Sequence, residues 1–218
     1  MRGSGFLAIW SDLSPEDETD WAHWMTREHS IERVRIEGFL ACRIFRALGT
    51  AVNRYFVLYD LEKPGIVGDA EYLARLDAPT PWSQSMMPRL RNFVRGGGRV
   101  ICTAGSGQGG VAAAIRLDAE PEWKPDAVCR ELASFDRVVA ARVMLTDLVP
   151  TSIQTREKRM RSEDSTFAGL LVIEGLDETS VRNALWRLRS LARQLDRRLT
   201  EEPLYVTCFN LDRRLLPG

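Results

Sequence analysis

Histidine is scarce in this sequence, and cysteine is scattered. Only two of the 218 residues are histidine, and the four cysteines lie far apart with no C-x-x-C pair. Sites for transition metals group His and Cys side chains at short spacings. The sequence therefore predicts no metal site, and we expect its cysteines to be reduced, buried thiols of a cytoplasmic protein.

The chain also lacks an excess of one charge and a long apolar segment. Lys and Arg number 30, as do Asp and Glu. This balance gives no reason to expect nucleic acid or an anionic membrane as a partner. No apolar run approaches the ~20 residues of a membrane span. The short run FLAIW near the N-terminus does not make a signal peptide. We therefore expect no membrane contact.

Familiar catalytic motifs are missing, and one ambiguous motif is present. The sequence has no nucleophile elbow, Walker loop or Ser-His-Asp pattern. Gly105, Gly107 and Gly110 form a G-x-G-x-x-G motif. In a nicotinamide-binding enzyme this motif opens a helix, and an acidic residue follows about 20 residues later. Here any such helix would end at AEPEWKP after about two turns. We interpret residues 105–110 as a hinge between two halves, with a phosphate-binding loop as the alternative.

What the sequence does contain is one order of elements that occurs twice. In the first half, Ser14 and Pro15 favour a helix start, and Trp21, Trp24 and Met25 fall on one helical face. The elements predicted in the first half are a strand at 5–12, this helix up to Gly38, strands at 39–48 and 54–62, a short helix at 69–76, a helical piece at 83–95 and a strand at 99–104. Those predicted in the second half are a strand at 110–118, a helix at 124–135, strands at 137–147 and 166–175, a helix at 177–199 and a strand at 203–212.

Both halves follow the β-α-β-β-α-β order of a ferredoxin-like unit. We therefore predict an α+β protein of two ferredoxin-like repeats, residues 1–105 and 106–218. Such a sheet carries helices on one face, and alternation divides its side chains into two sets. In the first repeat, the set expected on the uncovered face is Phe6, Ala8, Trp10, Ala41, Arg43, Phe45, Tyr55, Val57 and Tyr59. Because so many large apolar groups need cover, we expect the two sheets to pack together as an intramolecular α/β barrel.

The uncovered face mixes aromatic rings with a few polar groups, which is typical of a small-molecule site. We predict that Arg43 binds a carboxylate or enolate oxygen, that Tyr59 donates a hydrogen bond or a proton, and that Trp10 stacks on a flat ring. Further predicted substrate-binding residues are Phe45, Tyr55 and Trp24. The alternative is an ordinary packed interface with arginines at its rim.

His29 is the candidate proton carrier, because histidine titrates near neutral pH. It lies at the border of the apolar stripe of the first helix, where it either reaches a pocket or acts as a helix-end cation. The polar segment 148–166 is expected to be a solvated loop, with a lid as the alternative.

Three segments resemble the dimeric α/β-barrel superfamily, especially its EthD-like and related uncharacterised branches. They are FLAIWSDLSPEDETDWAHWMTREHSIERVRIEGFLACRIFRAL, RYFVLYDLE and DAPTPWSQSMMPRLRNF, with the pattern W…EH…R…GF…R before an aromatic strand. The superfamily normally builds its barrel from two subunits. The tandem duplication resembles a fused version of that barrel. Whether this chain also forms a homodimer is left open as an alternative. Members include monooxygenases, muconolactone-type isomerases, polyketide cyclases and haem-handling proteins. The resemblance implies a role at the barrel mouth for His29.

These observations lead to two main hypotheses. The first is a cofactor-independent enzyme of isomerase, cyclase, lyase or monooxygenase type. It would act on a small aromatic or polyketide-like anionic substrate in the barrel cavity, with His29, Arg43 and Tyr59 as catalytic residues. The second is a non-catalytic barrel protein that binds a small molecule or haem, with His29 as the candidate haem ligand. A nicotinamide enzyme that uses the glycine motif is a third, weaker hypothesis.

Overall fold

The computed structural model describes residues 2–49, 52–162, 164–191 and 203–217, and its centre is a closed barrel of antiparallel strands. The eight strands are β1 (Gly5–Asp12), β2 (Phe39–Ala47), β3 (Tyr55–Leu61), β4 (Arg91–Gly105), β5 (Val111–Leu117), β6 (Val138–Thr146), β7 (Gly169–Gly175) and β8 (Leu204–Asp212). Their order around the barrel is β1-β3-β2-β8-β5-β7-β6-β4, and β4 pairs with β1 to close it. The predicted α+β class and closed barrel are confirmed.

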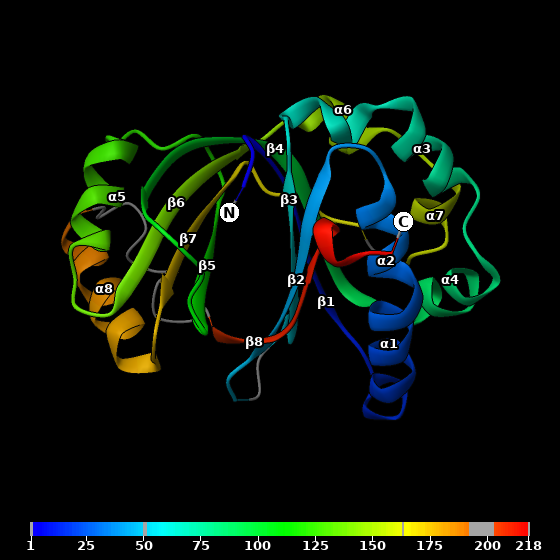
Figure 1. The fold of residues 1–218 in the computed structure, drawn as a ribbon, viewed down its shortest axis with the longest axis horizontal. Helices are drawn as coiled ribbons and strands as arrows, with labels where there is room; N and C mark the ends of the chain where they lie inside the picture. The colour runs from blue at the N-terminus through cyan, green and yellow to red at the C-terminus, as the bar shows by residue number, and fades with distance from the viewer. Residues whose placement is uncertain (1, 50–51, 163, 192–202, 218) are drawn as a thin grey trace.

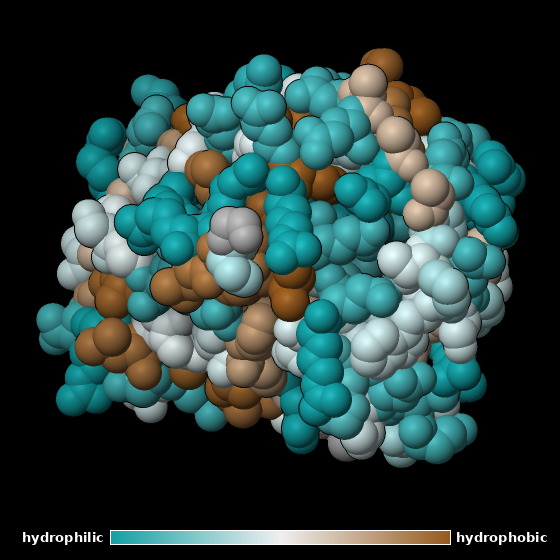
Figure 2. Space-filling model, turned by 45° about the vertical axis from the view of Figure 1, so that its right-hand side comes forward, coloured by the Kyte–Doolittle hydropathy of each residue, from teal (hydrophilic) through white to brown (hydrophobic). Residues whose placement is uncertain are grey.

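Helices cover the outside of the barrel on two sides (Figure 1). The first layer consists of α1 (Glu18–Trp24), η2 (Met25–His29), α2 (Ser30–Arg35), α3 (Ala70–Asp77), α4 (Pro81–Met86), α6 (Leu148–Ser152) and α7 (Arg156–Arg159), with the short turns η1 (Pro15–Asp17), η3 (Pro64–Gly68) and η4 (Met87–Arg89). The second layer is α5 (Pro125–Ala133) and α8 (Glu178–Leu191), and a last turn, η6 (Arg213–Leu215), follows β8. The predicted helix at 177–199 is confirmed up to residue 191, and the rest lies outside the described residues. Polar side chains predominate on the outer surface of the first layer (Figure 2), so its apolar side chains point toward the barrel.

Each half of the chain contributes four neighbouring strands. Their orders are β4-β1-β3-β2 and β8-β5-β7-β6, and the two sets meet where β2 pairs with β8 and β4 pairs with β6. Residues 106–110 connect β4 to β5. Because residues 111–117 form a strand, the glycine motif lacks the helix that a nicotinamide-binding loop requires. The phosphate-loop alternative is therefore wrong.

The prediction of a helical piece at 83–95 is also wrong for the second half of that segment. Helix α4 ends at Met86, and a turn that contains Pro88 leads into β4 at Arg91. This strand has 15 residues and pairs first with β1 and then with β6. At the crossing, a Cβ atom added to Gly98 would lie 2.1 Å from the carbonyl oxygen of Leu145. The glycine therefore permits a close strand approach that a larger residue would block.

The barrel interior is filled by side chains. Phe56 lies between two other aromatic residues, with ring centroids 4.6 Å from Trp10 and 5.1 Å from Phe45. The apolar side chains that share this interior are Phe6, Ala8, Ala47, Leu58, Val94, Ala112, Ala114, Met144, Phe167, Leu170, Val172 and Tyr205. Tight packing of this kind makes the interior a core.

Strand β3 faces the opposite way from the prediction. Trp10 and Phe45 face the interior as expected, and both are cross-strand partners of Phe56. Phe56 therefore points inward, and its neighbours Tyr55 and Tyr59 point outward into the core beneath the first helix layer. Every residue of β3 is buried. A strand that is apolar on both faces has no polar alternation to fix its phase.

Three charged side chains cross the barrel interior and join its two halves. Glu174 of β7 accepts hydrogen bonds from Arg43 of β2 at 2.7 and 3.3 Å and also pairs with Arg142 of β6. The backbone N–H of Gly109 donates to the same carboxylate at 3.0 Å, and Arg142 donates to the carbonyl of Gly107 at 2.9 Å. Burial disfavours the charged carboxylate, but the two arginines and these hydrogen bonds outweigh that effect and lower the pKa of Glu174. We call these three side chains the barrel ion cluster.

Replacing Glu174 by Gln should strongly destabilise the protein, because two buried arginines would lose their counter-charge. The expected loss is about 3–5 kcal/mol of unfolding free energy, measured by urea denaturation. Glu178→Gln is the matched control, because Glu178 and its partner Arg182 are 49% and 60% exposed on α8. The control should change stability by ~0.5 kcal/mol or less. Equal, small effects of both variants would contradict the cluster's role.

Candidate functional site

A small cavity lies outside the barrel, beneath the first helix layer. It has a volume of about 40 Å³ and lies between strands β1, β3 and β4 and the elements α1, η2, α2, α3 and α7. We call it the helix-side cavity. Its wall is largely apolar and aromatic, and its polar members are Ser11, His29, Arg33, Tyr59, Tyr72, Arg95, Glu157, Lys158 and Arg161. The volume holds a few water molecules, so a larger ligand requires the walls to move apart.

A π-helical turn brings His29 to this cavity. Residues 25–29 form the π-helix η2, in which the N–H of Ser30 donates to the carbonyl of Met25, five residues earlier. In an α-helix, residues five apart would lie about 140° apart around the axis. The wider turn instead places Trp24 and His29 on one face, with ring centroids 4.1 Å apart. Single π turns within helices are frequent at functional sites.

His29 is buried and only 6% exposed. Burial and the nearby charges of Arg33 and Arg161 lower the pKa of His29 well below its usual value. The imidazole is therefore neutral at pH 7. Its Nδ1 atom has no hydrogen-bond partner among the residues that the structure describes. A buried ring nitrogen without a partner is free to bind a ligand atom or a water molecule.

Tyr59 supplies a second polar group of this kind. Its side chain is 1% exposed, and within the described part of the chain its hydroxyl has no hydrogen-bond partner. Burial, together with the neighbouring Cys42, raises the pKa of Tyr59 well above its usual value. The phenol thus keeps its proton at neutral pH and can donate a hydrogen bond into the cavity.

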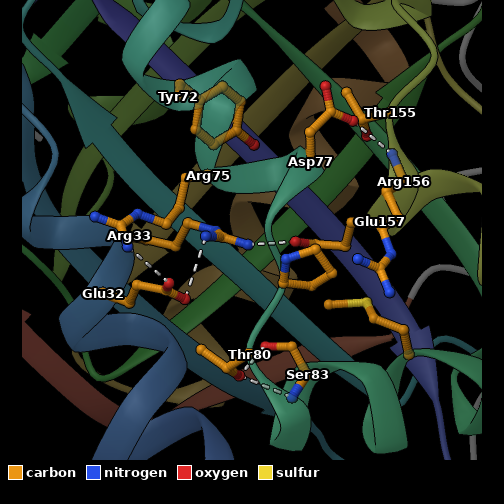
Figure 3. A network of polar contacts seen from close by, with 12 residues as sticks. Glu32, Arg33, Tyr72, Arg75, Asp77, Thr80, Ser83, Thr155, Arg156 and Glu157 are labelled. Carbon is orange, nitrogen blue, oxygen red and sulfur yellow. Dashed lines mark hydrogen bonds and ion pairs between the residues drawn. The ribbon is translucent and has the colours of Figure 1, made fainter.

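An ion-pair network joins the helix α2 to the segment around α7 (Figure 3). Arg33 lies between Glu157, at 2.5 Å, and Glu32, at 3.4 Å. The network also fixes α7 against α3, because Asp77 accepts a hydrogen bond from the backbone N–H of Arg156 at 2.7 Å. Helix α7 therefore forms one wall of the helix-side cavity.

The expectation of a solvated loop at 148–166 is corrected by this arrangement. Thr155 accepts a hydrogen bond at the start of α7 from the backbone N–H of Lys158. Both residues are buried, as are Thr151 and Glu157. The segment packs over the cavity because Glu157, Lys158 and Arg161 point inward. Its other charged side chains, Arg156, Arg159 and Asp164, are exposed.

Three further cations line the cavity. Arg95 donates a hydrogen bond to the hydroxyl of Tyr72 at 3.0 Å. The guanidinium of Arg161 lies 4.0 Å from the centroid of the Phe93 ring and pairs with Asp164 at 2.7 Å. Lys158 donates to the carbonyl of Thr151. Burial and the neighbouring Arg95 lower the pKa of Lys158 to about 8.

The predicted site residues fall into separate places. His29, Tyr59 and Trp24 line the helix-side cavity. Arg43, Trp10 and Phe45 lie inside the barrel, where Arg43 is held by Glu174. Tyr55 packs on Trp21, with ring centroids 4.1 Å apart.

The sequence alone does not point to the charged residues of the cavity. They are Arg33, Arg95, Glu157, Lys158 and Arg161. They come from three separate segments, and each looks like an ordinary surface charge in the sequence. The one local signal was Thr155, a favoured N-cap residue that indicates a short helix inside the supposed loop.

The fold is shared with several solved structures. An anthrone oxidase-like protein matches with a TM-score of 0.57 and 10% identity over 98% of this chain and 94% of its own. A candidate monooxygenase from Fusobacterium nucleatum matches with a TM-score of 0.54 and 9% identity over 97% and 96% of the two chains. A candidate chlorite dismutase matches with a TM-score of 0.52 and 11% identity over 95% of this chain and 96% of its own. No protein-family model and no curated protein matches the sequence.

At such low identity these matches show the fold alone. They agree with the closed α/β barrel that the sequence predicts. Within the described residues, no group of three or more His, Cys, Asp or Glu side chains is placed to hold a metal ion. Nor is any described helix both long and apolar enough to cross a membrane. All four cysteines are free; three are buried, and Cys208 is exposed.

The burial of His29 should make the protein less stable as the pH falls from 7 to 5. Its folded-state pKa lies below that of the unfolded chain, so the unfolded state binds the extra proton below about pH 6.5. One such group changes the unfolding free energy by at most about 1.4 kcal/mol per pH unit. Urea denaturation should show a shallower pH dependence for His29→Gln. His23→Gln should retain the dependence of the parent protein. A His29→Gln profile parallel to the parent's would contradict the assignment.

Proposed function

We propose that this chain is a cofactor-independent enzyme of isomerase, cyclase, lyase or monooxygenase type that acts on a small aromatic or polyketide-like anionic substrate. The substrate site is the helix-side cavity instead of the barrel interior. One observation carries the proposal: a mostly apolar cavity holds the His29 Nδ1 atom and the Tyr59 hydroxyl, both buried and without partners among the described residues. Leaving such groups unpaired costs about 1–3 kcal/mol each, which a bound substrate would offset.

The residues have distinct roles in this proposal. His29 is neutral and accepts a proton from the substrate, while Tyr59 donates a hydrogen bond to the oxygen on which negative charge develops. Trp24, held by a 3.2 Å hydrogen bond from its Nε1 to Ser83, provides a flat wall for an aromatic ring. Arg43 does not hold the substrate, because Glu174 already occupies its guanidinium.

The similar structures support the enzyme class only by analogy of fold. Two of them are described as an anthrone oxidase-like protein and a candidate monooxygenase. Chemistry of this kind needs a site that removes a proton from an aromatic compound, and His29 offers one.

We further infer that residues 1–105 and 106–218 are tandem ferredoxin-like repeats. The same relative strand order in both halves supports this. The single chain closes its own barrel, so a homodimer is not needed for closure. Free thiols at all four cysteines support a cytoplasmic location. The sequence pattern of the first half supports a place near the EthD-like branch.

The alternative is a non-catalytic protein that binds a small organic molecule in the same cavity. Haem as the ligand is disfavoured by the site, because His29 packs against Trp24 and the adjoining space is about 40 Å³. A porphyrin is much larger than a one- to three-ring aromatic molecule, so haem would require the cavity walls to move much farther apart than the proposed substrates do. Binding of a small aromatic molecule without conversion would favour this alternative.

Replacing His29 by Gln should lower turnover about 10²- to 10⁴-fold, because it removes the proton acceptor. The assay incubates the purified chain aerobically with anthrones and polycyclic phenols and follows oxygen uptake and absorbance. His23→Gln is the control and should match the parent protein. Equal turnover by His29→Gln would exclude His29 as the base. If the parent protein binds these compounds but does not convert them, the non-catalytic binding protein is favoured over the enzyme.

A further inference from the structure

The helix-side cavity carries more positive than negative charge. Arg33, Arg95, Lys158 and Arg161 line it, and each side chain is almost fully buried. Glu157 is the one carboxylate in the described lining. Since water is largely excluded here, each cation needs a counter-charge close by.

Two of the four cations have such a counter-charge. Arg33 is paired with Glu157 and Glu32, and Arg161 is paired with Asp164 from outside the lining. These pairs use the negative charge available next to the cavity.

Arg95 and Lys158 have no carboxylate partner among the residues that the structure describes. Arg95, which is 5% exposed, donates one side-chain hydrogen bond there, to the neutral hydroxyl of Tyr72. Lys158, which is 8% exposed, donates to the neutral carbonyl of Thr151. An arginine has five N–H donors and a lysine has three, so donors remain on both.

Both side chains line the helix-side cavity. Burial and the positive charges of Arg95 and Arg161 lower the pKa of Lys158, and the Asp164 carboxylate offsets this effect only in part. Burying like charges in one cavity that holds less negative than positive charge is unfavourable. An anion bound between them would relieve both the repulsion and the loss of hydration.

We propose that Arg95 and Lys158 form a binding site for the carboxylate of an aromatic carboxylic acid. The planar guanidinium of Arg95 suits a carboxylate through two parallel hydrogen bonds, and Lys158 supplies a third donor. The ring of the ligand lies along the apolar wall toward Trp24 and His29. This inference rests on the proposed function for the location of the site, and it adds the chemical class of the substrate.

The test compares benzoate with benzamide, which has nearly the same shape and no charge. Isothermal titration calorimetry on the full chain should give about 10-fold or tighter binding of benzoate. In Lys158→Met and Arg95→Met, benzoate affinity should fall about 10-fold or more, while benzamide affinity changes little. Arg182→Met, on the exposed face of α8, is the control and should bind both compounds like the parent protein.

A second measurement separates a binding role for Lys158 from a structural one. Lys158→Met should have an equal or higher Tm, because it removes an uncompensated charge from a desolvated place. A clearly lower Tm would overturn the proposal, as would benzamide binding as tightly as benzoate or failure of benzoate to bind at millimolar concentration.

The outcome is distinguishable from that of the enzymatic proposal. If the parent protein binds benzoate more tightly than benzamide, and this difference depends on Arg95 and Lys158, yet it converts no aromatic compound, the carboxylate site is supported and the enzymatic proposal is excluded. If it converts aromatic compounds whose anionic group is a phenolate or enolate and shows no preference for carboxylates, the enzymatic proposal is supported and the carboxylate site is excluded.

Discussion

The pairing of Glu174 with two arginines is the interaction on which the rest of this structure depends. Arg43 comes from the first half of the chain, Arg142 from the second, and Gly109 from the link between them. A fully buried carboxylate tolerates no shift that leaves it unpaired, so the cluster fixes how the two sets of strands meet. With the two sets of strands held in this way, apolar side chains fill the rest of the barrel interior. Space for a ligand therefore exists outside the barrel, where helices and connecting segments can be placed with more freedom.

The helix-side cavity differs from the barrel ion cluster in its balance of charge. Its charges are only partly balanced: Arg33 and Arg161 have carboxylate partners, while Arg95 and Lys158 lack them within the described chain. An unbalanced, desolvated cluster reduces the stability of the free protein, and such groups persist mainly where a ligand uses them. Polar groups without partners occur in both places: His29 Nδ1 and the Tyr59 hydroxyl at this cavity, and the Nε atoms of Arg43 and Arg142 in the barrel. The contrast between the two places therefore lies in the balance of charge. The barrel ion cluster and the cavity thus divide structure and binding between the two faces of one sheet.

Much of the fold follows from the sequence, and much of the site does not. Helix starts, strand order and closure of the barrel could be predicted, because apolar alternation and capping residues are local signals. The predicted orientation of β3 was wrong because both faces of this strand are buried, so the sequence does not show which side chains face the barrel interior. This error placed Tyr59 beside Arg43 inside the barrel, when it lies outside with His29. The roles of Arg95 and Lys158 were missed because only the tertiary fold brings these two residues to one cavity. A π turn has no clear sequence signal, so the contact between His29 and Trp24 could not be foreseen either.

The position of His29 connects the two proposals. In the ligand-free protein, burial and the charges of Arg33 and Arg161 keep its pKa low, so it is a weak proton acceptor. A carboxylate bound in the cavity would offset this positive potential and raise the pKa of His29. General-base catalysis is most effective when the pKa of the base lies near the working pH. The substrate's own anionic group would then activate the base that attacks it, and a neutral analogue of equal shape would meet a poorer catalyst. Selection for charged substrates would thus come from reactivity as well as from binding.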